Sequence, residues 1–213
     1  MATRYARVER ERLAGLLAAA GPDAPTRCAG WRTRELAAHL VLRERRPDAA
    51  AGIALKALAG WTHRVQSTLA ERPYDELVRL FGSGPPRLSL FALPGADEAA
   101  NVVEFFVHAE DVRRAGAAVD PGPVDPGLAE SLWRRLPSLL RFEHGRRLPV
   151  GLVLVHPDGR RAELAHRTAP TVEVTGEPGE LVLFGYGRGA CARITVSGAE
   201  TAVAALRRVL PLP

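Results

Sequence analysis

The chain has 213 residues, of which 46% are hydrophobic and 25% are charged. These values are ordinary for a globular protein and exclude an intrinsically disordered chain. The formal net charge is +5, but the basic residues are scattered among nearly as many acids and form only short clusters at expected helix ends, where cations complement the helix dipole. A nucleic-acid partner is therefore not expected.

Apolar segments and cysteines indicate the environment of the protein. The longest purely apolar runs are far shorter than the ~20 residues that cross a bilayer. The charged N-terminal segment MATRYARVERERL lacks the apolar centre of a secretion signal. The two cysteines, Cys28 and Cys191, do not make a disulfide framework. We expect a cytoplasmic protein with no membrane partner.

The first two thirds of the chain show the hydrophobic period of helices. Capping residues, prolines and glycines predict where these helices begin and end. The first expected helix stops at Gly21, and the second is capped by Thr33 and ends before Pro47. The third runs from about Trp61 to Phe81 and breaks at Pro73. The fourth runs from about Asp97 to Ala115, and the fifth is capped by Asp125.

After Pro149 the hydrophobic period changes to the two-residue alternation of strands. Two strands are expected around the Asp158-Gly159 turn and two more around Pro178-Gly179. The segment ARITVSG is a fifth expected strand, and AETAVAALRRVL is a closing helix.

The change of period divides the chain. It predicts an α+β protein with a helix-bundle domain over residues 1–147 and a small α/β domain over residues 148–213. Neither part contains an internal repeat or a low-complexity segment.

A narrow polar stripe marks the expected fourth helix. Glu104, His108 and Asp111 interrupt an apolar segment at intervals of four and three, which places them on one helix face. Asp97 and Asn101 extend this stripe. A face turned to solvent explains such a stripe, and so does a face turned to a ligand that needs a carboxylate and an imidazole.

His39 adds a second imidazole from another expected helix, in the apolar segment LAAHLVL. A single core histidine is usually only hydrogen-bonded. Together with Glu104 and His108, however, it completes a set that can supply three ligands to a divalent metal and leave a position open. Asp111, one turn beyond His108, or Glu35, one turn before His39, can accept a hydrogen bond from a ligating histidine.

The segments CAGWRTRELAAHL and NVVEFFVHAEDVRR together resemble the DinB-like metal-binding superfamily, in particular its mycothiol-dependent maleylpyruvate isomerase branch. In that branch, one helix of a bundle supplies a histidine, and a later helix supplies a glutamate and a histidine four residues apart. The resemblance implies that His39, Glu104 and His108 bind a divalent metal ion, with zinc as the expected metal.

The resemblance extends over nearly the whole chain. Members of this branch carry a small, sterol-carrier-like α/β domain at the C-terminus, and residues 150–213 are similar to it. The segments HLVLRERRPDA and GEPGELVLFGYGR are similar to an actinobacterial group of uncharacterised metal-binding proteins within the superfamily.

The activity that the resemblance implies is thiol chemistry. A small-molecule thiol of the mycothiol type would be the co-substrate, and the protein would transfer it to a small electrophile or isomerise that electrophile. Arg188, in FGYGRGA, lies where the family's small domain directs an arginine toward the pocket, which implies a catalytic role with an anionic substrate. A solvated loop arginine is the alternative interpretation.

Two other functions stay open at this point. One is a non-catalytic metal-binding or stress-response module, which would need the same ligands but no open pocket. The other is a metal-dependent hydrolase, although no general base follows His39 as it does in helical zinc peptidases.

Overall fold

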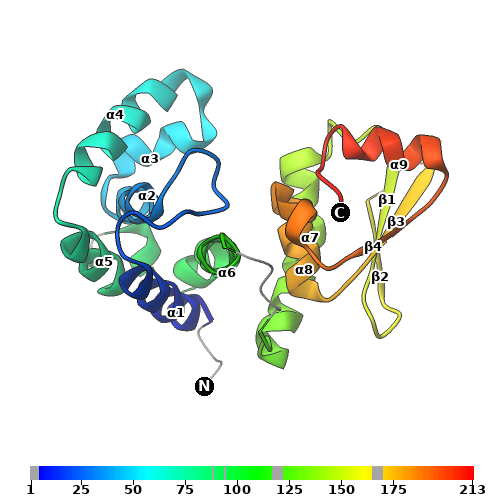
Figure 1. Cartoon of the computed structure of the whole chain (residues 1–213), viewed down its shortest axis with the longest axis horizontal. Coiled ribbons are helices and arrows are strands. Elements are labelled where there is room, and N and C mark those ends of the chain that lie inside the picture. Colours follow the sequence, from blue (N-terminus) through cyan, green and yellow to red (C-terminus); the bar gives the residue numbers. More distant parts are fainter. Residues whose placement is uncertain (1–4, 88, 94, 117–121, 165–169) are drawn as a thin grey trace. The chain divides into compact units, whose positions relative to one another are not determined.

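A computed structural model of the chain describes residues 5–87, 89–93, 95–116, 122–164 and 170–213. These residues form helices and one four-stranded sheet, so the expected α+β class is confirmed. The chain divides into two compact units between residues 120 and 121 (Figure 1).

The regular elements described in the first unit are helices, joined by loops. Its helices are α1 (Tyr5–Ala20), α2 (Thr33–Arg45), α3 (Pro47–Ala54), α4 (Ala59–Ala70), α5 (Tyr74–Gly82) and α6 (Ala96–Arg113). The predicted break at Pro73 and the helix end before Pro47 are confirmed. Proline lacks the backbone N–H that a helix interior uses and so favours a helix boundary at these two positions. The sequence did not predict α3 as a separate helix, although Pro47 takes a favoured position in its first turn.

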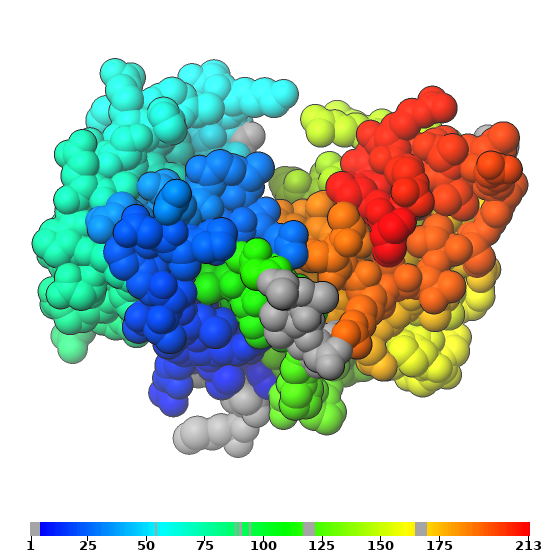
Figure 2. Space-filling model, viewed as in Figure 1, coloured from blue at the N-terminus to red at the C-terminus, as the bar shows by residue number. Residues whose placement is uncertain are grey.

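The core of the first unit joins the helices that carry the polar candidates. Apolar residues at helical spacing from α1, α2, α5 and α6 pack into one cluster. Its fully buried members include Leu13, Leu17, Leu36, Leu40, Leu77, Phe81, Phe105 and Ala109. Most residues of α6 between 101 and 111 are buried, and only a small green area of this helix shows in Figure 2.

The N-terminus of α2 differs by one residue from the sequence expectation. Arg32, not Thr33, is the N-cap, and its backbone N–H donates to Glu35 Oε2 at 2.9 Å. The Thr33 hydroxyl donates instead to the carbonyl of Gly21, which follows the last residue of α1. This contact ties the start of α2 to the end of α1.

The second unit begins with α7 (Pro126–His144), which Asp125 caps as predicted. Asp125 Oδ1 accepts hydrogen bonds from the backbone nitrogens of Gly127 at 2.9 Å and Leu128 at 3.0 Å. Such a cap contributes about 1 kcal/mol to helix stability.

A mixed sheet follows α7. Its strands are β1 (Gly151–Val155), β2 (Arg161–Leu164), β3 (Thr171–Thr175) and β4 (Thr195–Ser197), in the order β2-β1-β3-β4. The central pair, β1 and β3, is parallel, and both edge strands are antiparallel to their neighbours. The predicted hairpin between β1 and β2 is confirmed: Gly159 has a φ of 92°, and Asp158 Oδ1 accepts from the Arg160 backbone nitrogen at 3.0 Å.

The strand expected after Pro178-Gly179 is wrong, because this segment forms α8 (Pro178–Leu183). Every residue of α8 is buried, Glu180 included, and such a short buried run has no period that separates a strand from a helix. Pro178 at the first helical position is the local signal for the helix. The closing helix is confirmed as α9 (Glu200–Arg207), which packs on β3.

The division between the units lies at residue 120, not near residue 148 as the change of period suggested. The reason is that α7 packs against α8 and β2, so it belongs to the core of the second unit (Figure 1). The packing at Gly185 is close: His144 Nε2 of α7 lies 2.8 Å from its carbonyl oxygen, and an added Cβ at Gly185 would lie 3.0 Å from Leu140 Cδ2. Hydrophobic periodicity reports the type of an element but not its packing partner.

No helix among the described residues is both long and apolar enough to cross a membrane.

Candidate metal centre

His39 lies in the middle of α2 and is buried within the helical unit, with 7% of its surface exposed. Its ring and the ring of His108 on α6 are arranged edge to face, with centroids 5.7 Å apart and an interplanar angle of 76°. Trp31 packs on another side, with ring centroids 4.9 Å apart. These contacts hold the His39 imidazole toward α6.

Glu104 and His108 lie one turn apart on α6 and approach His39 together. Glu104 Oε1 is 3.2 Å from His108 Nε2 and 3.7 Å from His39 Nε2. One potential ligand atom from each of the three residues lies within 4.8 Å of the other two. The three side chains therefore converge, as the sequence predicted.

A second group of polar atoms lies behind His108. Its Nδ1 is 3.0 Å from Asp111 Oδ2 and 3.6 Å from Cys28 Sγ, and the Cys28 thiol donates to the same Asp111 oxygen at 3.1 Å. A carboxylate only accepts hydrogen bonds, so it holds the imidazole proton on Nδ1 and leaves Nε2 directed at Glu104. Asp111 is fully buried, which fixes this arrangement.

Arg43 brings a cation to the same oxygen of Glu104 that the two histidines approach. It lies one turn after His39 on α2, and its Nη1 is 3.5 Å from Glu104 Oε1. The same nitrogen donates to Asn101 Oδ1 at 3.2 Å. The site thus contains two imidazoles, one carboxylate and one guanidinium from two helices.

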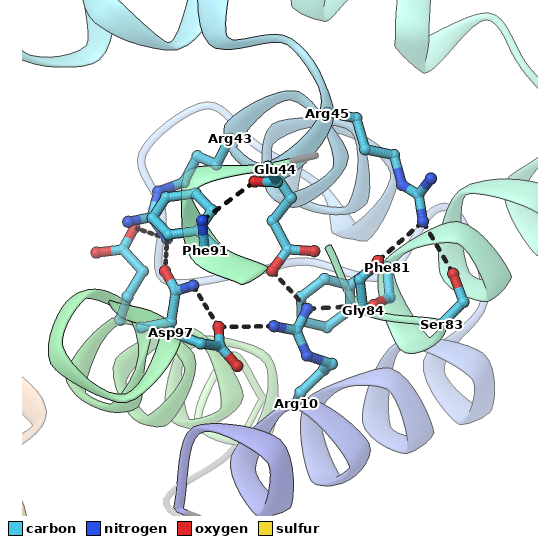
Figure 3. A network of polar contacts seen from close by, with 12 residues as sticks. Arg10, Arg43, Glu44, Arg45, Phe81, Ser83, Gly84, Phe91 and Asp97 are labelled. Atoms are coloured by element: carbon cyan, nitrogen blue, oxygen red, sulfur yellow. Dashed lines mark hydrogen bonds and ion pairs between the residues drawn. The ribbon is translucent and has the colours of Figure 1, made fainter. Parts of the chain in front are cut away.

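A network of polar contacts continues from Asn101 toward α1 (Figure 3). Asn101 Nδ2 donates to Asp97 Oδ1 at 2.7 Å, and Arg10 Nη2 donates to the same oxygen at 2.9 Å. Arg10 also pairs with Glu44, and its guanidinium lies 4.8 Å from the Phe105 ring centroid. Arg10 and Glu44 are almost fully buried, so the network lies inside the helical unit.

Burial and pairing shift the pKa values of the three candidate ligands in different directions. Burial lowers the pKa of His39, and its hydrogen bond to Glu104 only partly opposes this. Burial also opposes ionisation of Glu104, but the nearby Arg43 and the two imidazoles hold its pKa well below its usual value.

The pKa of His108 moves the other way. Burial opposes protonation, but the hydrogen-bonding partners of its two ring nitrogens, Asp111 foremost, outweigh burial and raise the pKa well above its usual value. At neutral pH these shifts favour a neutral His39, an ionised Glu104 and a protonated His108. A cation that took the place of the His108 Nε2 proton would meet a carboxylate and two imidazole nitrogens.

The remaining predicted residues have different positions. Asp111 occupies the expected place behind a candidate ligand, but Glu35 does not, because its carboxylate caps α2. Arg188 belongs to the second unit, in the helical turn Phe184–Arg188, where its Nη1 donates to the Tyr186 carbonyl at 2.7 Å. Its role toward a substrate stays a prediction.

Sequence reasoning missed two participants in this site. Cys28 is 80 positions from His108, and no spacing signal connects them. Arg43 had such a signal, since its distance of four residues from His39 places it on the same face of α2. From the sequence alone, Arg43 with Arg45 and Arg46 forms one of the short basic clusters at expected helix ends.

Comparisons with protein-family models, with curated proteins and with solved structures find no match for this chain.

Proposed function

We propose that the helical unit binds one divalent metal ion, zinc, through His39, Glu104 and His108. The observation that carries this proposal is the convergence of their ligand atoms within 4.8 Å of one another in a largely buried site. Bond lengths of about 2.0–2.1 Å in a tetrahedral zinc site separate neighbouring ligand atoms by about 3.3 Å. The distances of 3.2 and 3.7 Å from Glu104 Oε1 to the two Nε2 atoms fit this donor set.

The chemistry of the donors also fits. Nitrogen and oxygen ligands in a three-residue set are typical of catalytic zinc sites, which keep one position for water or substrate. Asp111 accepts from the Nδ1 of His108 and so fixes the tautomer that a ligating Nε2 requires.

We further propose that the protein acts on a small-molecule thiol and a small electrophile, as a thiol-dependent transferase or isomerase. A divalent cation at such a site lowers the pKa of a thiol and makes it nucleophilic near neutral pH. What supports this activity is the resemblance of the ligand-bearing segments to the mycothiol-dependent maleylpyruvate isomerase branch, together with ligands from α2 and α6 of one helical unit. On the same grounds we propose a DinB-like fold for this unit and a sterol-carrier-like fold for the second.

Metal analysis of the purified protein tests the first step. We expect about one zinc per chain in the wild type and a loss of at least about tenfold in zinc affinity in His39→Ala, because three protein ligands become two. His63→Ala is the matched control, since His63 is exposed on α4, and it should retain the metal. Equal zinc affinity in wild type and His39→Ala would refute the site.

A proton count gives a second measurement of the same step. Because the pKa of His108 is raised while those of His39 and Glu104 are lowered, binding at neutral pH should release about one proton per metal. Calorimetry in buffers of different ionisation enthalpy measures this number.

Thiol-dependent turnover tests the second step. We expect the zinc-loaded protein to consume mycothiol in the presence of model electrophiles, and His39→Ala to lose this turnover. A protein that binds zinc with the expected affinity but turns over no thiol with any electrophile would be a non-catalytic metal-binding module.

A further inference from the structure

Cys28, His108 and Asp111 form a second cluster of potential metal ligands in the helical unit. It lies at Nδ1 of the His108 ring, whereas Glu104 approaches Nε2. His108 Nδ1 is 3.0 Å from Asp111 Oδ2 and 3.6 Å from Cys28 Sγ, and this sulfur is 3.1 Å from the same Oδ2. All three residues are buried, with Asp111 fully enclosed. The cluster thus brings one sulfur, one nitrogen and one oxygen together inside the unit.

A turn in the loop between α1 and α2 holds the Cys28 thiol in place. The Cys28 backbone nitrogen donates to Thr26 Oγ1 at 3.1 Å, and its carbonyl accepts from the Trp31 nitrogen at 3.0 Å. The Arg27 nitrogen donates to the Asp111 carbonyl at 3.0 Å, which attaches the loop to α6. The thiol therefore lies beside α6 before any ligand binds, and this preorganisation lowers the entropic cost of assembling a site.

The separations of the three donor atoms are close to those that a tetrahedral metal site requires. Zinc bonds of about 2.3 Å to sulfur and about 2.0–2.1 Å to nitrogen or oxygen place neighbouring donors about 3.3–3.6 Å apart. The separation of 3.6 Å between Nδ1 and Sγ matches this range, and the distances of 3.0 and 3.1 Å to Asp111 Oδ2 are slightly shorter. Only a small outward movement of the side chains is needed to admit an ion.

The charges of the donors also suit a buried divalent cation. A Cys28 thiolate and the Asp111 carboxylate carry two negative charges, so a divalent ion with these two ligands and a neutral imidazole leaves no net charge in the interior. The imidazole proton then lies on Nε2 of His108, where Glu104 Oε1 is 3.2 Å away and accepts it. A thiolate ligand favours soft cations over the hard ones that oxygen ligands prefer.

We propose that Cys28, His108 and Asp111 bind a soft divalent cation in a site separate from the one that His39, Glu104 and His108 form. The ion replaces the thiol proton, which passes to solvent, and takes the lone pair of His108 Nδ1. A neutral imidazole has one free lone pair, so His108 serves one of the two sites at a time. The second site does not depend on His39.

Cadmium titration of the reduced, metal-free, full-length chain tests the proposal. A thiolate bound to cadmium absorbs in the ultraviolet by charge transfer from sulfur to the metal, and nitrogen and oxygen ligands do not produce this band. We expect a saturable band in the wild type at about one cadmium per chain. Cys28→Ser should lose the band and bind cadmium at least about tenfold more weakly, because a hydroxyl is a poor ligand for a soft ion.

Cys191→Ser is the matched control, because it removes the other cysteine of the chain, whose thiol donates to the Arg188 carbonyl in the second unit. It should keep the full band, which assigns the sulfur to Cys28 without any change at the site. A serine at position 28 can still donate to Asp111, and far-ultraviolet circular dichroism checks that Cys28→Ser keeps its helices.

His39→Ala separates this site from the first one, since it should lose zinc affinity but keep the cadmium band. No band in the wild type or in Cys191→Ser, or a band that persists in Cys28→Ser, would overturn the proposal. Loss of the band in His39→Ala would overturn a site that is independent of His39. Absence of zinc binding from the wild type would instead refute the first site and leave the cadmium result in force.

Discussion

The ring of His108 contacts acidic groups through both of its nitrogens. Nε2 is directed at Glu104, and Nδ1 is directed at Asp111 and Cys28. Only Nε2 lies on the side of His39, so only this nitrogen can bind a metal together with His39 and Glu104. Asp111 is therefore a positioning residue: it determines which nitrogen remains for a metal.

Replacement of Asp111 tests this role at the scale of one residue. We expect Asp111→Asn to weaken zinc affinity about 10–100-fold, because an amide can donate to Nδ1 and so favour the tautomer whose proton lies on Nε2. A chelator competition assay measures the affinity. Asp48→Asn, at an exposed carboxylate, is the control and should have no effect. Zinc affinity that does not change in Asp111→Asn would show that the tautomer is set by other contacts.

At the scale of elements, a buried ion pair joins the first two helices. Arg10 of α1 and Glu44 of α2 expose 3% and 1% of their side chains. Glu44 Oε2 has no hydrogen-bond partner among the described residues, and burial raises the pKa of this carboxyl although Arg10 opposes the shift. Buried pairs of this kind often contribute little net stability, while the loss of one partner leaves an uncompensated charge.

This asymmetry predicts the stability of two variants. Arg10→Met should lower the free energy of unfolding by about 3–5 kcal/mol, because Glu44 then stays buried without its cation. The double variant Arg10→Met with Glu44→Leu should recover part of that loss. Urea denaturation monitored by circular dichroism measures both. A double variant that is less stable than Arg10→Met would show that the pair itself stabilises the contact between α1 and α2.

At the scale of the whole molecule, the assignment of α7 to the second unit decides where the boundary between the two units lies. Its buried residues Leu132, Leu136 and Leu140 pack in the second unit, where α7 contacts α8 and β2. Each buried leucine contributes about 1.5–3 kcal/mol, which is a large fraction of the 5–15 kcal/mol that stabilises an ordinary domain. A fragment without α7 loses this contribution.

Two fragments of the chain test whether the second unit begins before or after α7. Residues 122–213 should fold alone, with a cooperative thermal transition and dispersed amide signals in a proton–nitrogen correlation spectrum. Residues 148–213 lack α7 and should not show this transition. If the shorter fragment folded equally well, α7 would not be part of the core of the second unit.

Some features could be predicted from the sequence because their causes are local. Proline at residue 73, the Asp125 cap and the Asp158-Gly159 turn act through neighbouring backbone atoms, and each is confirmed. The four-residue interval between Glu104 and His108 likewise places both on one helix face. The sequence also predicts the convergence of His39 with this pair, first from the residue types and their place in apolar helices and then from the family resemblance.

Other features depend on contacts between distant segments, and only the tertiary structure decided them. The sequence by itself determined the α+β class and the polar stripe on α6, because hydrophobic periods and turn residues act over a few positions. Tertiary packing placed Cys28 behind His108 and Arg43 beside Glu104, and it put α7 into the second unit and folded 178–183 as a helix. The physical reason is common to these cases: a side chain's neighbours across the core are set by packing, and the local period of the chain does not encode them.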